Sequence, residues 1–489
     1  MRQEETPQYR PVKDAHKTLG LWSIRRALTF AFTAAVVSLV AAWFLLSWLL
    51  GSPPHAKPKP LETKDLLELL KLVFALVAGV GALVALVTAY RRQRVDEAAG
   101  ERAERVQAHV EYGQAVELLG HDKAAVRLGG LYSLERLAQD HPYYRQTVTD
   151  VVCSYLRMPF QAPPANHGDQ DQQSANHTPR DPTAADTAWQ ELQVRLTAQR
   201  LLKRHLTTTD PRNHPSTYWD GLHIDLTGAH LIDFDFTNCH STNATFSNTR
   251  FSGDAGFGGA RFGGDAGFGG AQFSGNVRFG GAQFSGNVRF DGAQFSGNVR
   301  FDGAQFGGDA GFGGAQFSGN AGFDGAQFSG NAWFSAVRFG RNAGFGGVQF
   351  GGDAGFGGVQ FGGNARFDGA QFSGYAGFDG AQFSGNAWFS EARFGGNARF
   401  DEAQFSGDAG FDGARFGGDA GFSAAQFSGY TRFSGAQFSG DAGFDGAQFV
   451  REPEFADATA SYPNDAHIWP SPWCAQVVTS DMARLVRGS

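Results

Sequence analysis

The second half of the chain places phenylalanine at spacings that alternate between six and five residues, from Phe251 to Phe455, without a slip in register. Before Phe251, mostly apolar residues recur every five positions from Leu226. From Phe257 to Phe449, the residue two positions before each phenylalanine is Ala in 29 of 36 cases and Val in six. Residues i and i+2 of an extended segment point to the same side. The pattern therefore predicts very short strands that turn Ala and Phe inward, with Gly, Ser and Asp at the corners.

The extra residue of each six-residue interval is Asn or Asp in 16 of 19 cases and follows Gly in 17. Gly-Asn and Gly-Asp tolerate positive φ. We therefore predict a bulge at the corner, which keeps the next Phe inside. Two bulged faces among four predict a four-sided, 22-residue coil, and a two-sided, 11-residue coil is the alternative. At about 4.8 Å per coil, residues 222–458 predict roughly 11 coils and a rod about 50 Å long.

Two apolar segments near the start of the chain predict membrane-spanning helices at about residues 27–50 and 67–90, each long enough for a bilayer core of about 30 Å. Buried core helices are the alternative. Lys and Arg are frequent before the first segment and directly after the second, at Arg91, Arg92 and Arg94. The positive-inside rule then predicts a two-pass protein of the plasma membrane with both termini cytoplasmic. Residues 1–26 would be a cytoplasmic basic N-terminus, and residues 27–90 would contact the lipid bilayer.

The segments between the apolar start and the repeat predict a helical region at 91–160, a flexible linker at 161–187, and a helix with an N-terminal cap at 188–220. Val126–Ala138 spaces four leucines three residues apart, and Gly129-Gly130 would let a neighbouring helix approach closely. We interpret this region as a folded spacer, with a docking surface as the alternative. The repeat itself spans 221–458, and residues 459–489 form a C-terminal cap and tail. Trp469 and Trp473 are interpreted as lids on the last Phe layer rather than as a ligand pocket.

Composition and motifs argue against an enzyme. A net charge of −7 is too small to indicate a polyanion-binding protein, and three cysteines provide no disulfide framework. We find no nucleotide, zinc-protease or serine-hydrolase motif. His167 and His177 lack partners at ligand spacing. The sequence therefore predicts no catalytic residues, no cofactor and no metal.

The stretch Ile224–Phe236, IDLTGAHLIDFDF, fits an A-x-[L/F]-x-x unit, and the later part fits the same unit with an alternating extra residue. This pattern resembles the pentapeptide-repeat family. With the two apolar segments and VRLGGLYSLERLA (Val126–Ala138), the chain resembles membrane-anchored, actinobacterial-type members. The resemblance implies a mainly β solenoid, a right-handed quadrilateral β-helix, preceded here by two transmembrane helices and a small α-helical region.

The favoured function is a membrane-anchored, non-enzymatic scaffold whose rigid rod binds an unknown protein partner. No nucleic acid is expected as a partner, and a homo-oligomer is possible. Trp333 and Trp388 are the candidate exposed anchors, together with Arg278, Arg289 and Arg300, which recur at an 11-residue spacing and are expected to line one face.

The alternative comes from relatives that mimic B-form DNA and act on DNA gyrase. A mimic needs rows of carboxylates, whereas residues 222–458 hold 23 acidic and 13 basic residues. Acidic residues such as Asp291, Asp302 and Asp412 recur singly at corners and are interpreted as solvated turns. A repeat array shaped by duplication, with little selection on its surface, is a third possibility.

Overall fold

The computed structural model describes residues 63–163, 182–208, 215–461 and 467–488, with ten isolated positions between 29 and 48. The chain divides into two compact units, Met1–Gln107 and Ala108–Ser489. Helix α2 (Thr63–Leu119) begins in the first unit and ends in the second. It continues through the predicted boundary between residues 90 and 91.

The two predicted membrane-spanning helices are not supported by this structure. Among the described residues, no helix is long and apolar enough to cross a membrane. The first predicted segment, residues 27–50, lies largely outside the described residues. The second, residues 67–90, is helical but forms only part of α2, whose C-terminal half is rich in charged residues.

Three further helices and a short 3-10 turn form the helical part of the second unit: α3 (Ala124–Asp140), η1 (Pro142–Tyr144), α4 (Arg145–Arg157) and α5 (Pro182–Leu206). Leu131, Leu134 and Val152 are fully buried between them. A Cβ on Gly130 would lie 2.6 Å from the backbone nitrogen of Leu119, whereas one on Gly129 would meet nothing. The predicted close helix approach is therefore confirmed, and it depends on Gly130 alone.

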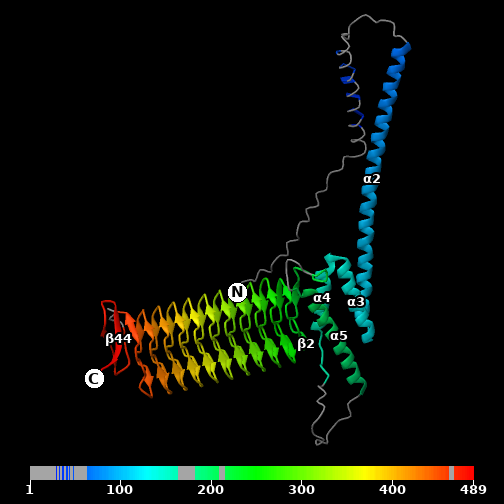
Figure 1. Ribbon diagram of the computed structural model, residues 1–489. Coiled ribbons are helices and arrows are strands. Elements are labelled where there is room, and N and C mark those ends of the chain that lie inside the picture. The colour runs from blue at the N-terminus through cyan, green and yellow to red at the C-terminus, as the bar shows by residue number, and fades with distance from the viewer. Residues whose placement is uncertain are drawn as a thin grey trace, which may run out of the picture. The chain divides into compact units, whose positions relative to one another are not determined.

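The repeat folds into a four-sided β solenoid (Figure 1). Each strand pairs in parallel with its counterpart one coil later, so that Phe284 lies beside Phe306 and Val277 beside Val299. This register confirms the 22-residue coil and excludes the 11-residue alternative. Successive strands β10, β11, β12 and β13 belong to four different sheets before β14 returns to the first. Each sheet is named below by a residue on its outer surface.

The Trp333 sheet contains β1 (His223–Asp225), β4 (Asn243–Thr245), β8 (Ala266–Gly267), β12 (Val288–Arg289), β16 (Ala310–Gly311), β20 (Ala332–Trp333), β24 (Ala354–Gly355), β28 (Ala376–Gly377), β32 (Ala398–Arg399), β36 (Ala420–Gly421) and β40 (Ala442–Gly443). The Trp388 sheet contains β6 (Ala255–Gly256), β10 (Val277–Arg278), β14 (Val299–Arg300), β18 (Ala321–Gly322), β22 (Ala343–Gly344), β26 (Ala365–Arg366), β30 (Ala387–Trp388), β34 (Ala409–Gly410) and β38 (Thr431–Arg432).

The first Gln sheet contains β2 (His230–Ile232), β5 (Arg250–Ser252), β9 (Gln272–Phe273), β13 (Gln294–Phe295), β17 (Gln316–Phe317), β21 (Arg338–Phe339), β25 (Gln360–Phe361), β29 (Gln382–Phe383), β33 (Gln404–Phe405), β37 (Gln426–Phe427) and β41 (Gln448–Phe449). The second Gln sheet contains β3 (His240–Ser241), β7 (Arg261–Phe262), β11 (Gln283–Phe284), β15 (Gln305–Phe306), β19 (Gln327–Phe328), β23 (Gln349–Phe350), β27 (Gln371–Phe372), β31 (Arg393–Phe394), β35 (Arg415–Phe416), β39 (Gln437–Phe438), β42 (Thr459–Ser461), β44 (Met482–Arg487) and β43 (Trp473–Val477).

The predicted inward positions form the core of the solenoid. Phe279, Phe284 and Phe290 are each at most 1% exposed. Rings in successive coils stack in parallel, with 5.1 Å between the centroids of Phe284 and Phe306. Rings on opposite sides meet edge to face, as Phe279 and Phe290 do at 5.3 Å. Both arrangements are favourable for aromatic pairs, so the core is a continuous lattice of rings along the rod.

The predicted positive φ at the six-residue corners is wrong for all of them except the first, where Gly253 adopts it. Positive φ occurs instead in the five-residue corners, for example at Gly281 and Gly292. In the six-residue corners the glycine serves close stacking, because a Cβ on Gly286 would lie 2.5 Å from the carbonyl carbon of Gly264. The Asn or Asp that follows accepts a hydrogen bond from the next coil: Asn298 Oδ1 receives the Asn320 N–H at 2.9 Å. These corners are therefore held by ladders of side-chain acceptors.

Aromatic side chains cover the Phe core at both ends of the solenoid. Trp219 is 1% exposed in the core beside the first coil, and its ring stacks on His205 of α5 at 3.8 Å. At the other end the ring centroids of Trp469 and Phe438 are 5.3 Å apart, and those of Trp473 and Phe455 are 5.5 Å apart. The interpretation of the C-terminal tryptophans as lids is therefore confirmed.

Candidate interaction surface

The outer surface of each sheet shows one side chain per coil, because the other residues of each short strand point inward. On the two Gln sheets this outward residue is Gln in most coils, and each of these glutamines is exposed or half-buried. On the Trp333 and Trp388 sheets it is Gly, Arg or Trp in most coils. A Gln sheet separates these two sheets on either side, so the Trp333 and Trp388 sheets are opposite faces of the rod.

Two aromatic rings lie across glycines on the Trp333 sheet. Trp333 is 42% exposed, and a Cβ on Gly355, one coil further on, would lie 2.7 Å from its Cε3. Tyr375 covers Gly377, two residues further along the same coil, where a Cβ would lie 2.7 Å from Cε1 of the tyrosine. Gly355 and Gly377 are both buried under these rings. Because these outward glycines have no side chain, the neighbouring aromatic rings can pack directly on their backbone.

A charged group adjoins these rings. Arg399 forms ion pairs with Asp379 at 3.3 Å and with Asp401 at 2.9 Å. The Tyr375 hydroxyl donates a hydrogen bond to Asp379 at 2.9 Å. Burial, and next the neighbouring Asp379, raises the pKa of Tyr375 to about 12, so the hydroxyl keeps its proton at neutral pH. We call Trp333, Tyr375 and Arg399 the Trp333 patch.

The Trp388 sheet carries a similar arrangement. Trp388 is half-buried and lies over Gly410, where a Cβ would be 3.4 Å from its Cδ1. Arg366 reaches Asp324 at 2.9 Å, and Arg432 reaches Asp412 at 3.0 Å. These ion pairs are partly exposed, so each contributes little to stability. They fix the direction of these guanidinium groups on the face.

The expected single row of arginines is wrong. Arg278 and Arg300 are neighbours on the Trp388 sheet, whereas Arg289 lies on the Trp333 sheet. An 11-residue spacing is half a coil, and it therefore alternates between opposite faces. All three side chains are exposed, and no ion pair of theirs is seen in the described part of the chain. An odd number of such spacings also separates Trp333 from Trp388, so these two side chains face opposite directions.

The acidic corners are structural and electrostatically crowded. Asp324 Oδ1 accepts a hydrogen bond from the Gly346 N–H at 2.7 Å, and Asp401 Oδ1 accepts one from Ser423 at 2.8 Å. Burial, and next the charge of Asp324 one coil away, raises the pKa of Asp302. Burial also raises the pKa of Asp368. These carboxylates bind backbone amides of the same solenoid.

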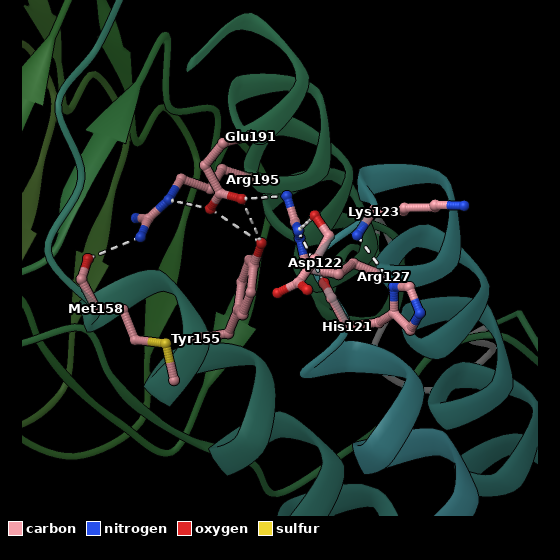
Figure 2. A network of polar contacts seen from close by, with 8 residues as sticks. All are labelled: His121, Asp122, Lys123, Arg127, Tyr155, Met158, Glu191 and Arg195. Atoms are coloured by element: carbon pink, nitrogen blue, oxygen red, sulfur yellow. Dashed lines mark hydrogen bonds and ion pairs between the residues drawn. The ribbon is translucent and has the colours of Figure 1, made fainter. Parts of the chain in front are cut away.

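A second polar group joins the helices at the start of the rod (Figure 2). Glu191 of α5 lies between Arg127 of α3 and Arg195 of α5, 2.9 Å from each. It also accepts a hydrogen bond from the Tyr155 hydroxyl of α4 at 2.9 Å. Arg195 is 3% exposed and donates to the Met158 carbonyl at 2.7 Å. One carboxylate therefore ties three helices together.

Candidate chemical groups are few in the described ranges. No cluster of three or more His, Cys, Asp or Glu residues that could hold a metal ion occurs there. Cys153 and Cys239 are buried, and burial raises the pKa of each thiol to about 12. Such thiols are poor nucleophiles at neutral pH, because the thiolate is the reactive form.

Comparison with known proteins agrees with this geometry. A family profile described as "Pentapeptide repeats (9 copies)" matches residues 226–272, 268–316, 312–360, 335–382, 356–404, 378–426 and 400–448. The repeat segment belongs to the pentapeptide-repeat family. No curated protein and no solved structure gives a significant match to the chain. The pentapeptide-repeat rod therefore indicates a structural or interaction module.

Two features of this surface were missed by sequence reasoning. Tyr375 stands where most coils carry Asn or Asp, and only the structure shows it lying over Gly377. The sequence signal was present, because an aromatic residue interrupts an otherwise regular column. The packing of Trp333 and Trp388 on glycines of the next coil can be predicted only once the length of the coil is known.

Proposed function

We propose that this protein is a membrane-anchored, non-enzymatic scaffold whose pentapeptide-repeat rod binds a protein partner. The Trp333 patch is the observation that carries the proposal. Trp, Tyr and Arg are the residue types most enriched among binding hot spots. Here they are held on a rigid, in-register sheet, so little conformational entropy would be lost on binding.

The proposed anchor comprises residues 27–50 and 67–90, with both termini cytoplasmic. It is supported by the uncharged runs at residues 27–50 and 72–90 and by the positive residues that flank them. Phe74 is 66% exposed and Leu86 is 70% exposed on α2. Such large apolar side chains would be covered by acyl chains in a bilayer.

The alternative, a DNA mimic that acts on gyrase, has less support. A mimic presents carboxylates to its target, whereas several corner carboxylates of this rod accept backbone hydrogen bonds or pair with Arg366, Arg399 and Arg432. Exposed arginines on two opposite faces also interrupt any negative surface.

The proposal is tested by crosslinking the tagged full-length protein in cells, followed by mass spectrometry of the washed membrane fraction. We expect the protein to remain with the membranes and to capture a partner that Trp333→Ala loses. Gln360→Ala on the first Gln sheet is the matched control and should keep the partner. The scaffold proposal fails if no captured partner is lost in Trp333→Ala, and the anchor fails if carbonate washing releases the chain. Gyrase subunits among the captured proteins would favour the alternative.

A further inference from the structure

Among the residues that the structure describes, no strand pairs with the outer edge of β43, the last strand of the second Gln sheet. In this sheet β42 pairs in parallel with β39 of the preceding coil, β44 and then β43 follow in antiparallel order, and β43 is the last strand. Its sequence, WCAQV, contains no charge and no proline, and Cys474, Ala475, Gln476 and Val477 are all exposed. Proteins usually protect edge strands with charges, prolines or a covering element. This edge has neither charge nor proline within the strand.

The register of the hairpin shows which backbone groups face outward. The Val478 N–H donates to the Met482 carbonyl at 2.9 Å, and the Gly488 N–H donates to the Pro472 carbonyl at 2.7 Å. Hydrogen-bonded pairs alternate along an antiparallel ladder, so Cys474 and Gln476 also turn their backbone groups toward β44. Trp473, Ala475 and Val477 therefore direct theirs away from it. The Trp473 N–H is already bonded to the Pro470 carbonyl.

Apolar side chains accompany this free edge. Ala475 lies opposite Leu485 and Val477 lies opposite Ala483, so they share the face on which Leu485 and Ala483 are buried. Val477 nevertheless remains 52% exposed. The face that covers the end of the core therefore extends onto β43 and is left uncovered there.

We propose that β43 of a second copy of this chain pairs antiparallel with this edge, about a two-fold axis at Ala475. Each Ala475 would exchange hydrogen bonds with its counterpart, and each Val477 N–H would reach the Trp473 carbonyl of the other copy. Val477 of one copy would then lie beside Trp473 of the other, which covers its exposed surface. The uncharged strand brings no like charges together across the axis.

A second copy suits this edge because the pairing is self-complementary. A two-fold contact uses the same residues on both sides and closes on itself, so it forms a dimer rather than a filament. The opposite end of the solenoid is covered, since α4 packs on β1 and β2 and α5 packs on β2. The uncovered strand is therefore at one end, which favours joining two rods tail to tail.

The proposed register makes a specific disulfide possible. With the axis at Ala475, Cys474 of one copy faces Gln476 of the other in a non-hydrogen-bonded pair, where Cα atoms are about 4.5 Å apart. Disulfides bridge Cα separations of about 4.4–6.8 Å. Two Cys474 residues would be diagonal neighbours at about 7–8 Å, which is too far. The buried Cys153 and Cys239 do not interfere.

The experiment oxidises full-length Gln476→Cys protein mildly in detergent and measures disulfide-linked dimer by non-reducing electrophoresis. We expect several-fold more dimer than in the unsubstituted chain, and a return to that background in Cys474→Ala/Gln476→Cys. The proposal is overturned if Gln476→Cys stays monomeric, or if the double variant crosslinks equally well.

A proline provides the second control. Ala475→Pro removes an N–H that points away from β44, so it leaves the intramolecular ladder intact. Added to Gln476→Cys, it should abolish the crosslink while the thermal unfolding midpoint is unchanged. Val477→Lys, which adds an edge charge, serves if the proline variant does not fold. Undiminished crosslinking in a folded variant of either kind would exclude β43 as the interface.

Discussion

At the scale of single residues, the corners show why this chain is so rich in glycine. The column from Gly264 to Gly440 is glycine in every coil, because parallel in-register stacking places each Cα directly above the previous one. A Cβ on Gly286 would meet the Gly264 carbonyl carbon at 2.5 Å and its oxygen at 2.7 Å. Such contacts involve backbone atoms, which cannot rotate away. The equivalent column at the opposite corner accepts Arg341, so the constraint is stricter in the first column.

Gly286→Ala is therefore expected to destabilise the rod by about 1–3 kcal/mol, as overpacking typically does. Gly280→Ala is the matched control, since its Cβ would come no closer than 3.6 Å to any other atom and its φ is not positive. Its effect should stay within about 0.5 kcal/mol. Urea unfolding followed by circular dichroism measures both variants. Equal midpoints for the two would contradict the stacking explanation.

The corner carboxylates predict a pH dependence. The raised pKa of Asp302, caused by burial and by Asp324, means that the folded state holds this proton to a higher pH than the unfolded chain does. Its contribution to stability therefore falls as pH rises from the unfolded pKa of about 3.9 through the folded value. At neutral pH the unfavourable contribution of Asp302 to the stability of the fold is fully present.

Asp302→Asn should consequently raise the urea midpoint at pH 7 and lose this advantage below about pH 3.9, where both states are protonated. The amide oxygen keeps the hydrogen-bond acceptor at this corner, so the variant removes only the charge. Midpoints measured between pH 3 and pH 7 follow the effect. An advantage that grows on acidification would show that the carboxylate stabilises the fold.

At the scale of the elements, the spacing of apolar residues was sufficient to predict the strands. Ala and Phe at positions i and i+2 determine which side of each strand is buried, and burial of apolar surface is the main driving force of folding. The corner conformation could not be predicted in the same way. Gly-Asn suggested positive φ, whereas the observed role of Gly286 depends on Gly264, a neighbour in the preceding coil. Local propensity does not contain that contact.

The surface was less predictable for the same reason. Trp333 is exposed as expected, but whether Arg289 joins Arg278 depends on the length of the coil rather than on the 11-residue repeat of the sequence. Because consecutive 11-residue units are nearly identical, the sequence suggests that equivalent side chains of all units lie on one face. The chain alternates them between two faces.

At the scale of the whole rod, each 11-residue unit therefore acts as a half turn. Any two side chains that occupy the same position of the unit share a face when an even number of units separates them. Trp333 and Trp388 are five units apart and lie on opposite sheets. Gain or loss of a single unit by duplication or deletion would preserve the core and reverse the face of everything beyond it. Selection on such a surface therefore acts on whether the number of units between two side chains is odd or even, as well as on the side chains themselves.

Deletion of residues 356–366 tests this parity. The alternation of five and six is retained, so we expect a folded rod in which four units separate the two tryptophan positions, placing them two coils apart, about 10 Å, on one face. With both tryptophans replaced by cysteine in a Cys474→Ala chain, a maleimide crosslinker of matching length should join them. Deletion of residues 356–377, a whole coil, leaves the positions on opposite faces and should prevent the crosslink. If both deletions crosslink equally, or if only the whole-coil deletion folds, the half-turn unit is wrong.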